Sequence, residues 1–398
     1  MDSELLDTQG VTYPRGFRAS AINCGIRKDR LDLALVAADT PATAAGVFTR
    51  NLCCAAPVLL SKRHINSEHV RAIVVNSGNA NAATGDRGLR AAEVCAGETA
   101  RRLGCTPNEV LVASTGVIGV PLPFEKIVGG LDALVQDLSV GGGAAAAQAI
   151  LTTDTFVKQR ACDVRLGAGS VRIGGIAKGS GMIMPDMATL LGFITTDAAI
   201  DRRRLQQMLA RAVATSFNRI TVDGDTSTND MVVLLASGAS GMAVSGADEE
   251  LFRSALERIC TELARLIVRD GEGATKFVTV RVEGCATDRD ADTIARAVAN
   301  SPLVKTALCG CNPNWGRIIA AVGRAGVAFD PNRISVCLNG ILACSNGMNA
   351  GAAKPVLDAV FKEKEIEIRI VLDAGPASAT IWTCDLSHGY VDINMDYS

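Results

Sequence analysis

Short apolar runs of strand length recur along this chain and alternate with stretches of helical periodicity. The strand-like runs give way to polar or turn-forming residues at Leu31–Val36, Val70–Asn76 and Val110–Ala113. Apolar residues at helical spacing predict helices over Gly88–Leu103, after a capping Asp201, and from Asp248 to a stop at Gly271. Strands that alternate with helices in this way predict an α/β fold.

The pattern changes near residues 275–280. There Val278, Val280 and Val282 alternate with polar residues, which predicts a half-buried strand. Further predicted elements follow at Asp288–Asn300, Ile334–Leu338, Pro355–Phe361, Ile366–Leu372 and Ala379–Thr383. We therefore predict a main α/β domain over 1–277 and a smaller C-terminal α/β domain over 278–398.

Composition favours a small-molecule enzyme with a large core. The chain has 398 residues, 48% of them hydrophobic, and a net charge of −2 from 40 basic and 42 acidic residues. This balance gives no electrostatic reason to bind nucleic acid or a membrane surface. The first residues lack the basic and then apolar pattern of a secretory signal, and no apolar run is long enough to span a bilayer. We expect a cytoplasmic protein.

The cysteines do not form a recognisable metal or disulfide framework. Their number, 13, is odd, and they are scattered from Cys24 to Cys384. Neither Cys53-Cys54 nor Cys309-Gly310-Cys311 has the spacing of a zinc knuckle, and the chain has only three histidines. We expect reduced, mostly buried thiols, no metal and no cofactor.

The segment from Lys178 to Leu191 places a hydroxyl residue, Thr189, directly after a small residue, Ala188. Cleavage of the bond between them would give Thr189 a free α-amine, whose pKa of roughly 7.7–8.0 lets it accept the hydroxyl proton near neutral pH. One residue would then supply both nucleophile and base. On the dipeptide alone, the better interpretation is that Thr189 starts a buried strand, Thr189–Thr195, with its hydroxyl bound to backbone.

Three other polar segments are candidates for function, and each has a structural alternative. Ser114-Thr115-Gly116 follows a strand and can present N–H groups and a hydroxyl to an oxyanion, although it is also ordinary turn chemistry. Thr152-Thr153-Asp154 reads either as a helix terminus or as a contact to substrate. The acids of Asp223–Asp230 lack the calcium-loop pattern, so we expect a polar loop with satisfied hydrogen bonds. Trp315, in Asn314–Arg317 between elements, is expected to pack in a core.

Several blocks of this sequence together resemble the ornithine acetyltransferase family, the glutamate N-acetyltransferases of arginine biosynthesis. The resemblance covers essentially the whole chain, in order, through Asn76–Asn81, Ser114–Gly119, Thr152–Asp154, Lys178–Thr189, Asp223–Asp230, Glu272–Lys276, Asn314–Arg317 and Tyr390–Ser398. It implies an αββα-type sandwich of the self-cleaving N-terminal-nucleophile kind. It also implies self-cleavage between Ala188 and Thr189, with the products assembling as α2β2.

The resemblance further implies which residues carry the reaction. Acetyl would move from N2-acetylornithine to L-glutamate through an acetylated Thr189, with an oxyanion hole at Thr115 and Gly116. Substrate-binding residues would be Thr153, Lys178, Glu272, Asn394 and Ser398. Thr152 is nearly as good a choice as Thr153, and this tail ends one residue before the pattern that we expect around Ser398. Whether acetyl-CoA is a second donor is left open.

Two other functions remain to be weighed against the acetyltransferase. One is an amidohydrolase or aminopeptidase that uses the same self-cleaved threonine with water as acceptor. The other is an inactive, uncleaved homologue that acts as a binding protein. Asp186 stands where we expect asparagine before Met187, a departure that bears on the rate of cleavage.

Overall fold

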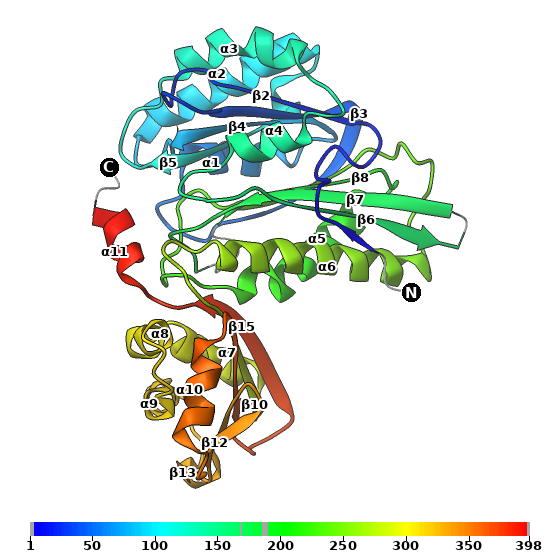
Figure 1. Ribbon diagram of the computed structural model, residues 1–398. Helices are drawn as coiled ribbons and strands as arrows, with labels where there is room; N and C mark the ends of the chain where they lie inside the picture. Colours follow the sequence, from blue (N-terminus) through cyan, green and yellow to red (C-terminus); the bar gives the residue numbers. More distant parts are fainter. Residues whose placement is uncertain (1–3, 168, 185–189, 396–398) are drawn as a thin grey trace. The chain divides into compact units, whose positions relative to one another are not determined.

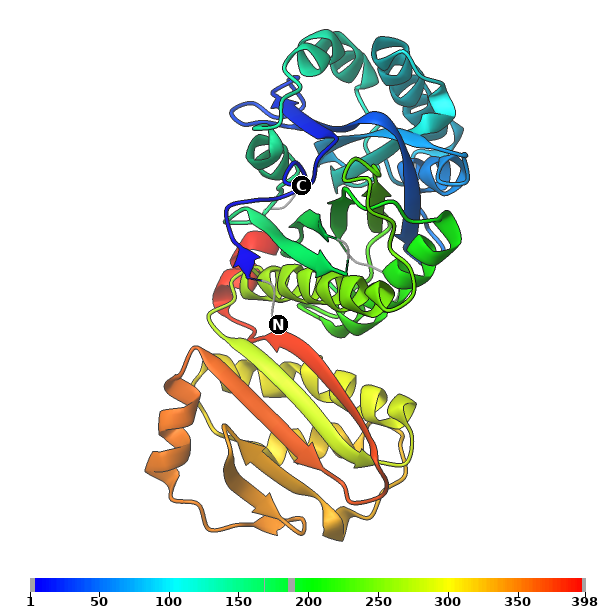
Figure 2. The ribbon, with the colours of Figure 1, turned by 90° about the vertical axis from the view of Figure 1, so that its right-hand side faces the viewer.

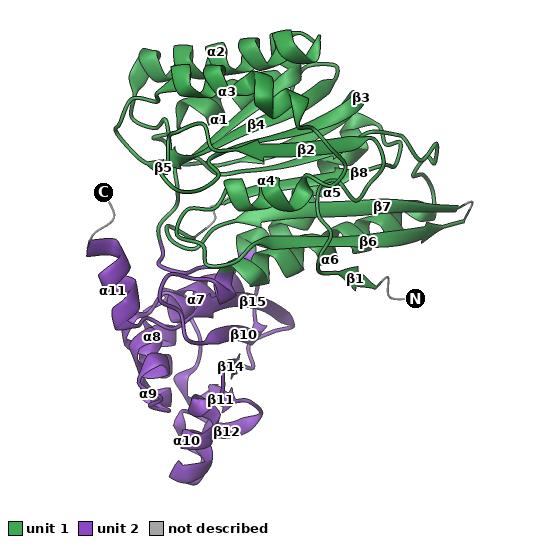
Figure 3. Cartoon of the chain, turned by 45° about the horizontal axis from the view of Figure 1, so that its top comes forward, with its two compact units in different colours: residues 1–218, 225–267 green, residues 219–224, 268–398 purple. Residues whose placement is uncertain are grey.

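The computed structural model describes residues 4–167, 169–184 and 190–395. The chain forms two compact units, coloured separately in Figure 3. Unit 1 consists of residues 1–218 and 225–267, and unit 2 of residues 219–224 and 268–398.

This division differs from the predicted boundary between residues 277 and 278. Asp385 explains why unit 2 begins earlier, because its Oδ1 atom accepts the backbone N–H groups of Thr275 and Lys276 at 2.8 and 2.9 Å. The short segment 219–224 joins unit 2 because the Thr221 amide donates to the Trp382 carbonyl at 2.9 Å. Contacts far apart in sequence place these residues, so a change in periodicity could not locate the boundary.

Unit 1 contains two layers of strands, with helices on the outer side of each layer (Figure 1). Its elements are β1 (Leu5–Leu6), β2 (Phe17–Ile22), β3 (Leu33–Phe48), α1 (Ala56–His64), β4 (Val70–Asn79), α2 (Gly85–Leu103), β5 (Val110–Val117), α3 (Phe124–Gln136), α4 (Gly143–Ala149), β6 (Lys158–Leu166), β7 (Gly169–Lys178), β8 (Leu191–Thr196), α5 (Arg202–Thr215), β9 (Met231–Ala236) and α6 (Asp248–Arg269, of which the last two residues belong to unit 2).

Strand β3 belongs to both layers of the sandwich. Its first half pairs with β2 and β4, and its second half pairs with β9. The pairing with β4 is interrupted between Ala37 and Ala42, where Pro41 has no N–H group to donate. In the described part of the sheet, the strand order is β1-β6-β7-β8-β9-β3-β4-β5, and β2 pairs with β3 outside this order.

The two halves of this sheet pack face to face between two layers of helices (Figure 1). Helices α2 and α3 cover β2, β4 and β5, whereas α5 and α6 cover the half formed by β6 to β9. The inner core joins both halves through residues such as Val75, Phe193 and Val233, all buried. Helix α4 adds Ala146, Ala147 and Ala149 to that core, so its alanine-rich sequence suits a narrow space. The predicted αββα sandwich is confirmed.

Most predicted elements of unit 1 are present, with one wrong assignment. Asp201 caps α5, as expected, by accepting the Arg204 amide. In the helix predicted from Asp248, the apolar spacing also places Leu251 on the buried stripe, and this was wrong because Leu251 of α6 is 51% exposed. It precedes the buried Phe252, and one residue turns a helix by about 100°, which carries Leu251 out of the stripe.

Unit 2 is a six-stranded sheet with its main core against one face (Figure 2). The predicted alternation in β10 is confirmed, because Val278, Val280 and Val282 are all fully buried in that core. Its elements are β10 (Phe277–Cys285), α7 (Asp288–Ala299), α8 (Pro302–Cys309), α9 (Trp315–Gly323), β11 (Ser335–Leu338), β12 (Ile341–Ser345), β13 (Met348–Asn349), α10 (Lys354–Lys362), β14 (Glu365–Val371), β15 (Ala377–Cys384) and α11 (His388–Met395). The strand order is β13-β12-β11-β14-β10-β15.

The prediction that Asn314–Arg317 lies between elements was wrong. These residues begin α9, and Asn314 caps it by accepting the Arg317 amide at 3.2 Å. Trp315 is partly buried and packs against the core of unit 2. An asparagine before an apolar helical stretch is a usual N-cap signal, so this start was readable from sequence. None of the helices within the described residues is both long and apolar enough to cross a membrane.

Candidate active site

Two predicted site residues, Lys178 and Thr115, meet where strands of unit 1 end. Lys178 is the last residue of β7 and pairs with Leu191, the first residue of β8. Its ammonium Nζ donates to the Thr115 hydroxyl across the sandwich at 3.3 Å, and Lys178 is only 8% exposed. The structure therefore brings two predicted site residues together from different halves of the sheet.

Gly116 occupies a position that only glycine fits. Its φ is 134°, a conformation that residues with a side chain rarely adopt. A Cβ atom on Gly116 would lie 2.3 Å from the carbonyl carbon of Gly78. The predicted role of Thr115 and Gly116 as an oxyanion hole stays a prediction.

The buried carboxylate of Asp154 lies beside Lys178 and accepts hydrogen bonds from the groups around it. Asp154 accepts Lys158 Nζ and the Gly179 amide at 2.7 Å through Oδ1, and the Thr152 amide at 2.9 Å through Oδ2. Lys178 Nζ lies 4.0 Å from the same Oδ2. Two ammonium groups thus share one carboxylate in a buried network.

The electrostatics of Asp154 follow from this geometry. Burial by itself raises the pKa of the carboxyl, but the nearby Lys178 and Lys158 ammonium groups outweigh it and hold the pKa of Asp154 below its ordinary value. Asp154 and Lys158 were not among the site residues predicted from the sequence. Their spacing of four residues was visible, but the meeting with Lys178 depends on the fold.

Thr152 and Thr153 differ in their burial and in their hydrogen bonds. Thr152 is buried, and its hydroxyl and amide both donate to Asp154. Its carbonyl accepts Arg30 Nη2 at 2.8 Å. Thr153 is partly exposed beside this network. The choice of Thr153 as the substrate-facing hydroxyl stays a prediction.

Side chains of the polar segment 225–230 donate hydrogen bonds to the end of β5 and to the chain before residue 185. Asn229 Nδ2 donates to the carbonyls of Ala80 and Ser114 at 2.5 and 2.9 Å. The Thr226 hydroxyl donates to the Met184 carbonyl at 2.7 Å. The expectation that every acid in this loop is satisfied was wrong at Asp230, since its buried Oδ2 atom has no hydrogen-bond partner in the described chain.

Unit 2 brings two further predicted residues together. Asn394 Nδ2, on α11, donates to Glu272 Oε2 at 2.7 Å, although the residues are 122 positions apart. Glu272 is 7% exposed and Asn394 is exposed. Both residues were predicted from the sequence, but their pairing was not.

Three predicted site residues lie outside the described part of the chain. They are Ala188, Thr189 and Ser398. The described chain resumes after the first two at Leu190, which is buried and whose carbonyl accepts the Met231 amide at 3.0 Å.

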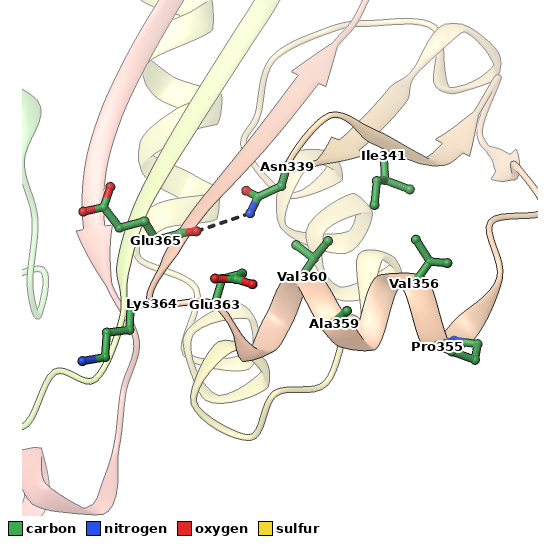
Figure 4. Close-up of a pocket in the computed structure, with 9 residues that line it drawn as sticks. All are labelled: Asn339, Ile341, Pro355, Val356, Ala359, Val360, Glu363, Lys364 and Glu365. Atoms are coloured by element: carbon green, nitrogen blue, oxygen red, sulfur yellow. Dashed lines mark hydrogen bonds between the residues drawn. The ribbon is translucent and has the colours of Figure 1, made fainter.

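A groove in unit 2 contains none of the predicted residues (Figure 4). It lies between α10 and the turn joining β11 to β12, and its lining residues include Asn339, Ile341 and Val356. Asn339 is already engaged, because its Oδ1 atom accepts the Glu367 amide at 2.6 Å. Within the described residues, no group of three or more His, Cys, Asp or Glu side chains could hold a metal ion.

Gly116→Ala tests the steric requirement at the strand end. We expect a loss of at least ~1–3 kcal/mol in the free energy of unfolding, because alanine disfavours this φ and its Cβ meets the Gly78 backbone. Urea unfolding measures this loss. Gly97→Ala in α2 is the matched control, since its new methyl group meets no atom within 4 Å. A helical Gly→Ala change there should stabilise by up to ~1 kcal/mol. Equal stability of the two variants would contradict the requirement.

The variant Asp154→Asn tests the buried network through the pH dependence of the free energy of unfolding. Removing one partner of a buried ion pair costs roughly 3–5 kcal/mol, so the variant should be that much less stable near neutral pH. Because the pKa of Asp154 is lowered, its stabilisation is present above the ordinary aspartate pKa of about 3.9 and is lost as the pH falls through the lowered value.

The difference in stability between wild type and Asp154→Asn should therefore be constant from about pH 5 to pH 8 and shrink below about pH 4. Denaturant unfolding at each pH measures it. Asp132→Asn, which removes an exposed partner of Arg102, should change stability little. A difference that does not shrink on acidification would show that Asp154 is not held ionised by the lysines.

Comparison with known proteins agrees with the resemblance seen in the sequence. Residues 18–398 match the ArgJ family. The arginine biosynthesis bifunctional protein of Chlorobaculum tepidum is 50% identical over 393 residues, covering 98% of this chain and 97% of its own length. That of Geobacter sulfurreducens is 50% identical over 390 residues, covering 96% and 99%.

A solved structure is also similar, that of the arginine biosynthesis bifunctional protein from Bacillus halodurans. It is 42% identical with a TM-score of 0.51, and it covers 52% of this chain and 100% of its own. The structural similarity therefore extends over about half of the fold described above. With a family match over nearly its full length and relatives at 50% identity, this chain belongs to the ArgJ family.

Proposed function

We propose that this protein is a glutamate N-acetyltransferase that moves acetyl from N2-acetylornithine to L-glutamate after cutting itself between Ala188 and Thr189. Membership of the ArgJ family supports this activity. The coverage of the Bacillus halodurans chain supports the cleavage. That chain is matched completely yet accounts for 52% of this one, which is about the share of residues 189–398.

The observation that carries the proposal is the hydrogen bond from Lys178 Nζ to the Thr115 hydroxyl. It lies where β7 ends, and β8, which pairs with β7 there, begins two residues after Thr189. An ammonium donor on the Thr115 oxygen leaves that hydroxyl free to turn its own proton toward an oxyanion. The net positive charge of two lysines and Asp154 favours the same negative charge.

The reaction has two acyl-transfer steps. The Thr189 hydroxyl attacks the acetyl carbonyl of N2-acetylornithine while its α-amine takes the proton, and Thr115 and Gly116 stabilise the tetrahedral oxyanion. Collapse of that intermediate breaks the acetyl C–N bond, returns the proton to the leaving amine and releases ornithine. The amine of L-glutamate then attacks the acetyl-threonine ester and restores Thr189.

The remaining predicted residues serve substrate binding. Lys178 and Thr153 suit a substrate carboxylate, and Glu272 suits an ammonium group. The Asn394 amide already holds the Glu272 carboxylate, so Asn394 orients it as well as contacting substrate. Ser398 is the remaining hydroxyl residue that we assign to substrate binding. No metal or cofactor enters the reaction.

The two products of cleavage stay together and assemble as α2β2. Residue 190 and β8 are buried in the core of unit 1, so the C-terminal product is part of the same sandwich as the N-terminal one. We place the enzyme in the cytoplasm, where arginine biosynthesis would supply its substrates. The word bifunctional in the names of its relatives favours acetyl-CoA as a second acetyl donor.

Two measurements separate the rival functions. A hydrolase with the same nucleophile would release free acetate, whereas the transferase forms N-acetylglutamate from acetylornithine. An inactive homologue would remain a single band near 41.4 kDa on denaturing electrophoresis, whereas the enzyme gives two smaller bands.

Substitution of Thr189 tests the proposal directly. Thr189→Ala should stay uncleaved and lose acetyl exchange by at least 10³-fold, because it lacks both hydroxyl and free amine. Thr189→Ser keeps both groups and should cleave and exchange, though more slowly. Double-reciprocal plots should be parallel in wild type, and the same assay with acetyl-CoA tests the second donor. Acetyl exchange by an uncleaved Thr189→Ala protein would contradict the mechanism.

A further inference from the structure

The carboxyl group of Asp385 holds the loop that follows Glu272. Its Oδ1 atom accepts the amides of Thr275 and Lys276 at 2.8 and 2.9 Å, and its Oδ2 atom accepts the Thr275 hydroxyl at 2.6 Å. Asp385 is only 2% exposed, so these hydrogen bonds are shielded from water. One buried carboxyl group therefore fixes the backbone a few residues after Glu272.

Asp385 is itself held in place from both sides. The ammonium group of Lys305, on α8, donates to the Cys384 carbonyl, and to the Thr383 hydroxyl at 3.1 Å. The Leu386 amide donates to the Lys305 carbonyl at 3.2 Å. The residues before and after Asp385 are thus tied to the same buried lysine. The carboxyl group that holds the loop therefore has a fixed position in unit 2.

The segment after this carboxyl group returns to the same loop. The Ser387 hydroxyl donates to the Gly273 carbonyl at 2.5 Å. Gly273 has a φ of 65°, and a Cβ atom on it would lie 2.3 Å from the Tyr390 amide nitrogen, so the two segments are in direct contact. One turn further along α11, Asn394 donates to the Glu272 Oε2 atom at 2.7 Å. The segment therefore contacts the loop at both of its ends.

We propose that Asp385 is a positioning residue for Glu272 and thereby sets the selectivity for an acetyl donor whose side chain carries an ammonium group. This rests on the proposed function, in which Glu272 pairs with that ammonium group. A carboxylate accepts several hydrogen bonds, so the contact from Asn394 leaves Glu272 able to bind an ammonium group as well. A displacement of about 1 Å in such a contact can cost ~10²-fold in rate.

The role of Asp385 is confined to the recognition of charge on the donor. Its hydrogen bonds described above all lie within unit 2, whereas Thr115 and Gly116, which we predict to stabilise the oxyanion, belong to unit 1. Loss of Asp385 therefore slows acetylation by a donor that has the ammonium group and spares a donor that lacks it. A general loss of folded protein would instead lower the activity toward both donors alike.

The test compares two acetyl donors on the self-cleaved enzyme. N2-acetylornithine carries the side-chain ammonium group, and N2-acetylnorvaline has the same carbon chain without it. In a ping-pong reaction, kcat/KM for the donor reports on the first half-reaction alone, so the ratio of the two values measures recognition of the ammonium group. This ratio does not depend on how much of the protein is folded. The wild type should prefer N2-acetylornithine by at least ~100-fold.

Variants of the loop contact should change this ratio in a graded way. Asp385→Ala removes three hydrogen bonds to the loop and should lower the ratio by at least ~10-fold, with kcat/KM for N2-acetylnorvaline within ~3-fold of wild type. Asp385→Asn keeps a carbonyl oxygen for the two amides and should hold the ratio within ~3-fold of wild type. Thr275→Val removes only the hydroxyl contact and should lower the ratio by at least ~3-fold, which gives a result even if Asp385→Ala does not fold.

The matched control is Thr287→Ala in the same unit. The Thr287 hydroxyl caps α7 by accepting the Asp290 amide at 3.1 Å. Loss of this cap should lower the stability of the protein and leave the donor ratio unchanged. A wild-type ratio in Asp385→Ala or in Thr275→Val would overturn the proposal. An Asp385→Asn protein as unselective as Asp385→Ala would also overturn it.

Glu272→Gln separates the failure of this proposal from that of the proposed function. It removes the negative charge that pairs with the ammonium group and should lower the ratio to below ~10-fold. A wild-type ratio in Glu272→Gln would refute the substrate role of Glu272 in the proposed function, and the positioning role with it. A ratio lost in Glu272→Gln but kept in Asp385→Ala would refute the positioning role alone.

Discussion

The Asp154 carboxylate is the interaction on which the active end of unit 1 depends. A buried carboxylate is costly unless cations and N–H groups surround it, and here Lys158, Lys178 and the Gly179 amide do so. Lys158 is the first residue of β6, whereas Lys178 ends β7 and Gly179 follows it directly. Satisfying the charge of Asp154 therefore fixes where the start of β6 meets the end of β7, and it directs the Lys178 ammonium toward Thr115.

The site exists because the sandwich joins strand ends that are remote in sequence. Strand β5 carries Thr115 and Gly116 in one half of the sheet, while β7, β8 and β9 begin or end beside one another in the other half. Two local departures from an ideal protein accompany it: the positive φ of Gly116 and the unsatisfied oxygen of Asp230. Glycine adopts this φ readily, whereas the unsatisfied oxygen costs stability, which is typical of positions kept for function rather than for folding.

Periodicity was enough to predict most of the elements but not their contacts. The alternation at Val278–Val282 and the cap at Asp201 are local, and the structure has both. The boundary near residue 268 and the Glu272–Asn394 pair depend on contacts more than 100 residues apart, which no local pattern encodes. Likewise, Asp154 and Asp230 looked like ordinary polar residues, because their burial and partners arise only when β7, β8 and β9 align. The family resemblance named Thr115, Lys178 and Glu272, whereas geometry added Asp154, whose Oδ2 atom lies 4.0 Å from the Lys178 ammonium.

The central claim is that residue 189 becomes an N-terminal acyl carrier. Mature protein incubated with N2-acetylornithine in the absence of glutamate, quenched in acid and examined by mass spectrometry, tests it most directly. The account predicts that the fragment beginning at Thr189 gains the mass of one acetyl group on that residue and loses it when glutamate is added. An unbroken chain through residue 188, or acetyl exchange with no acetyl group on residue 189, would contradict it.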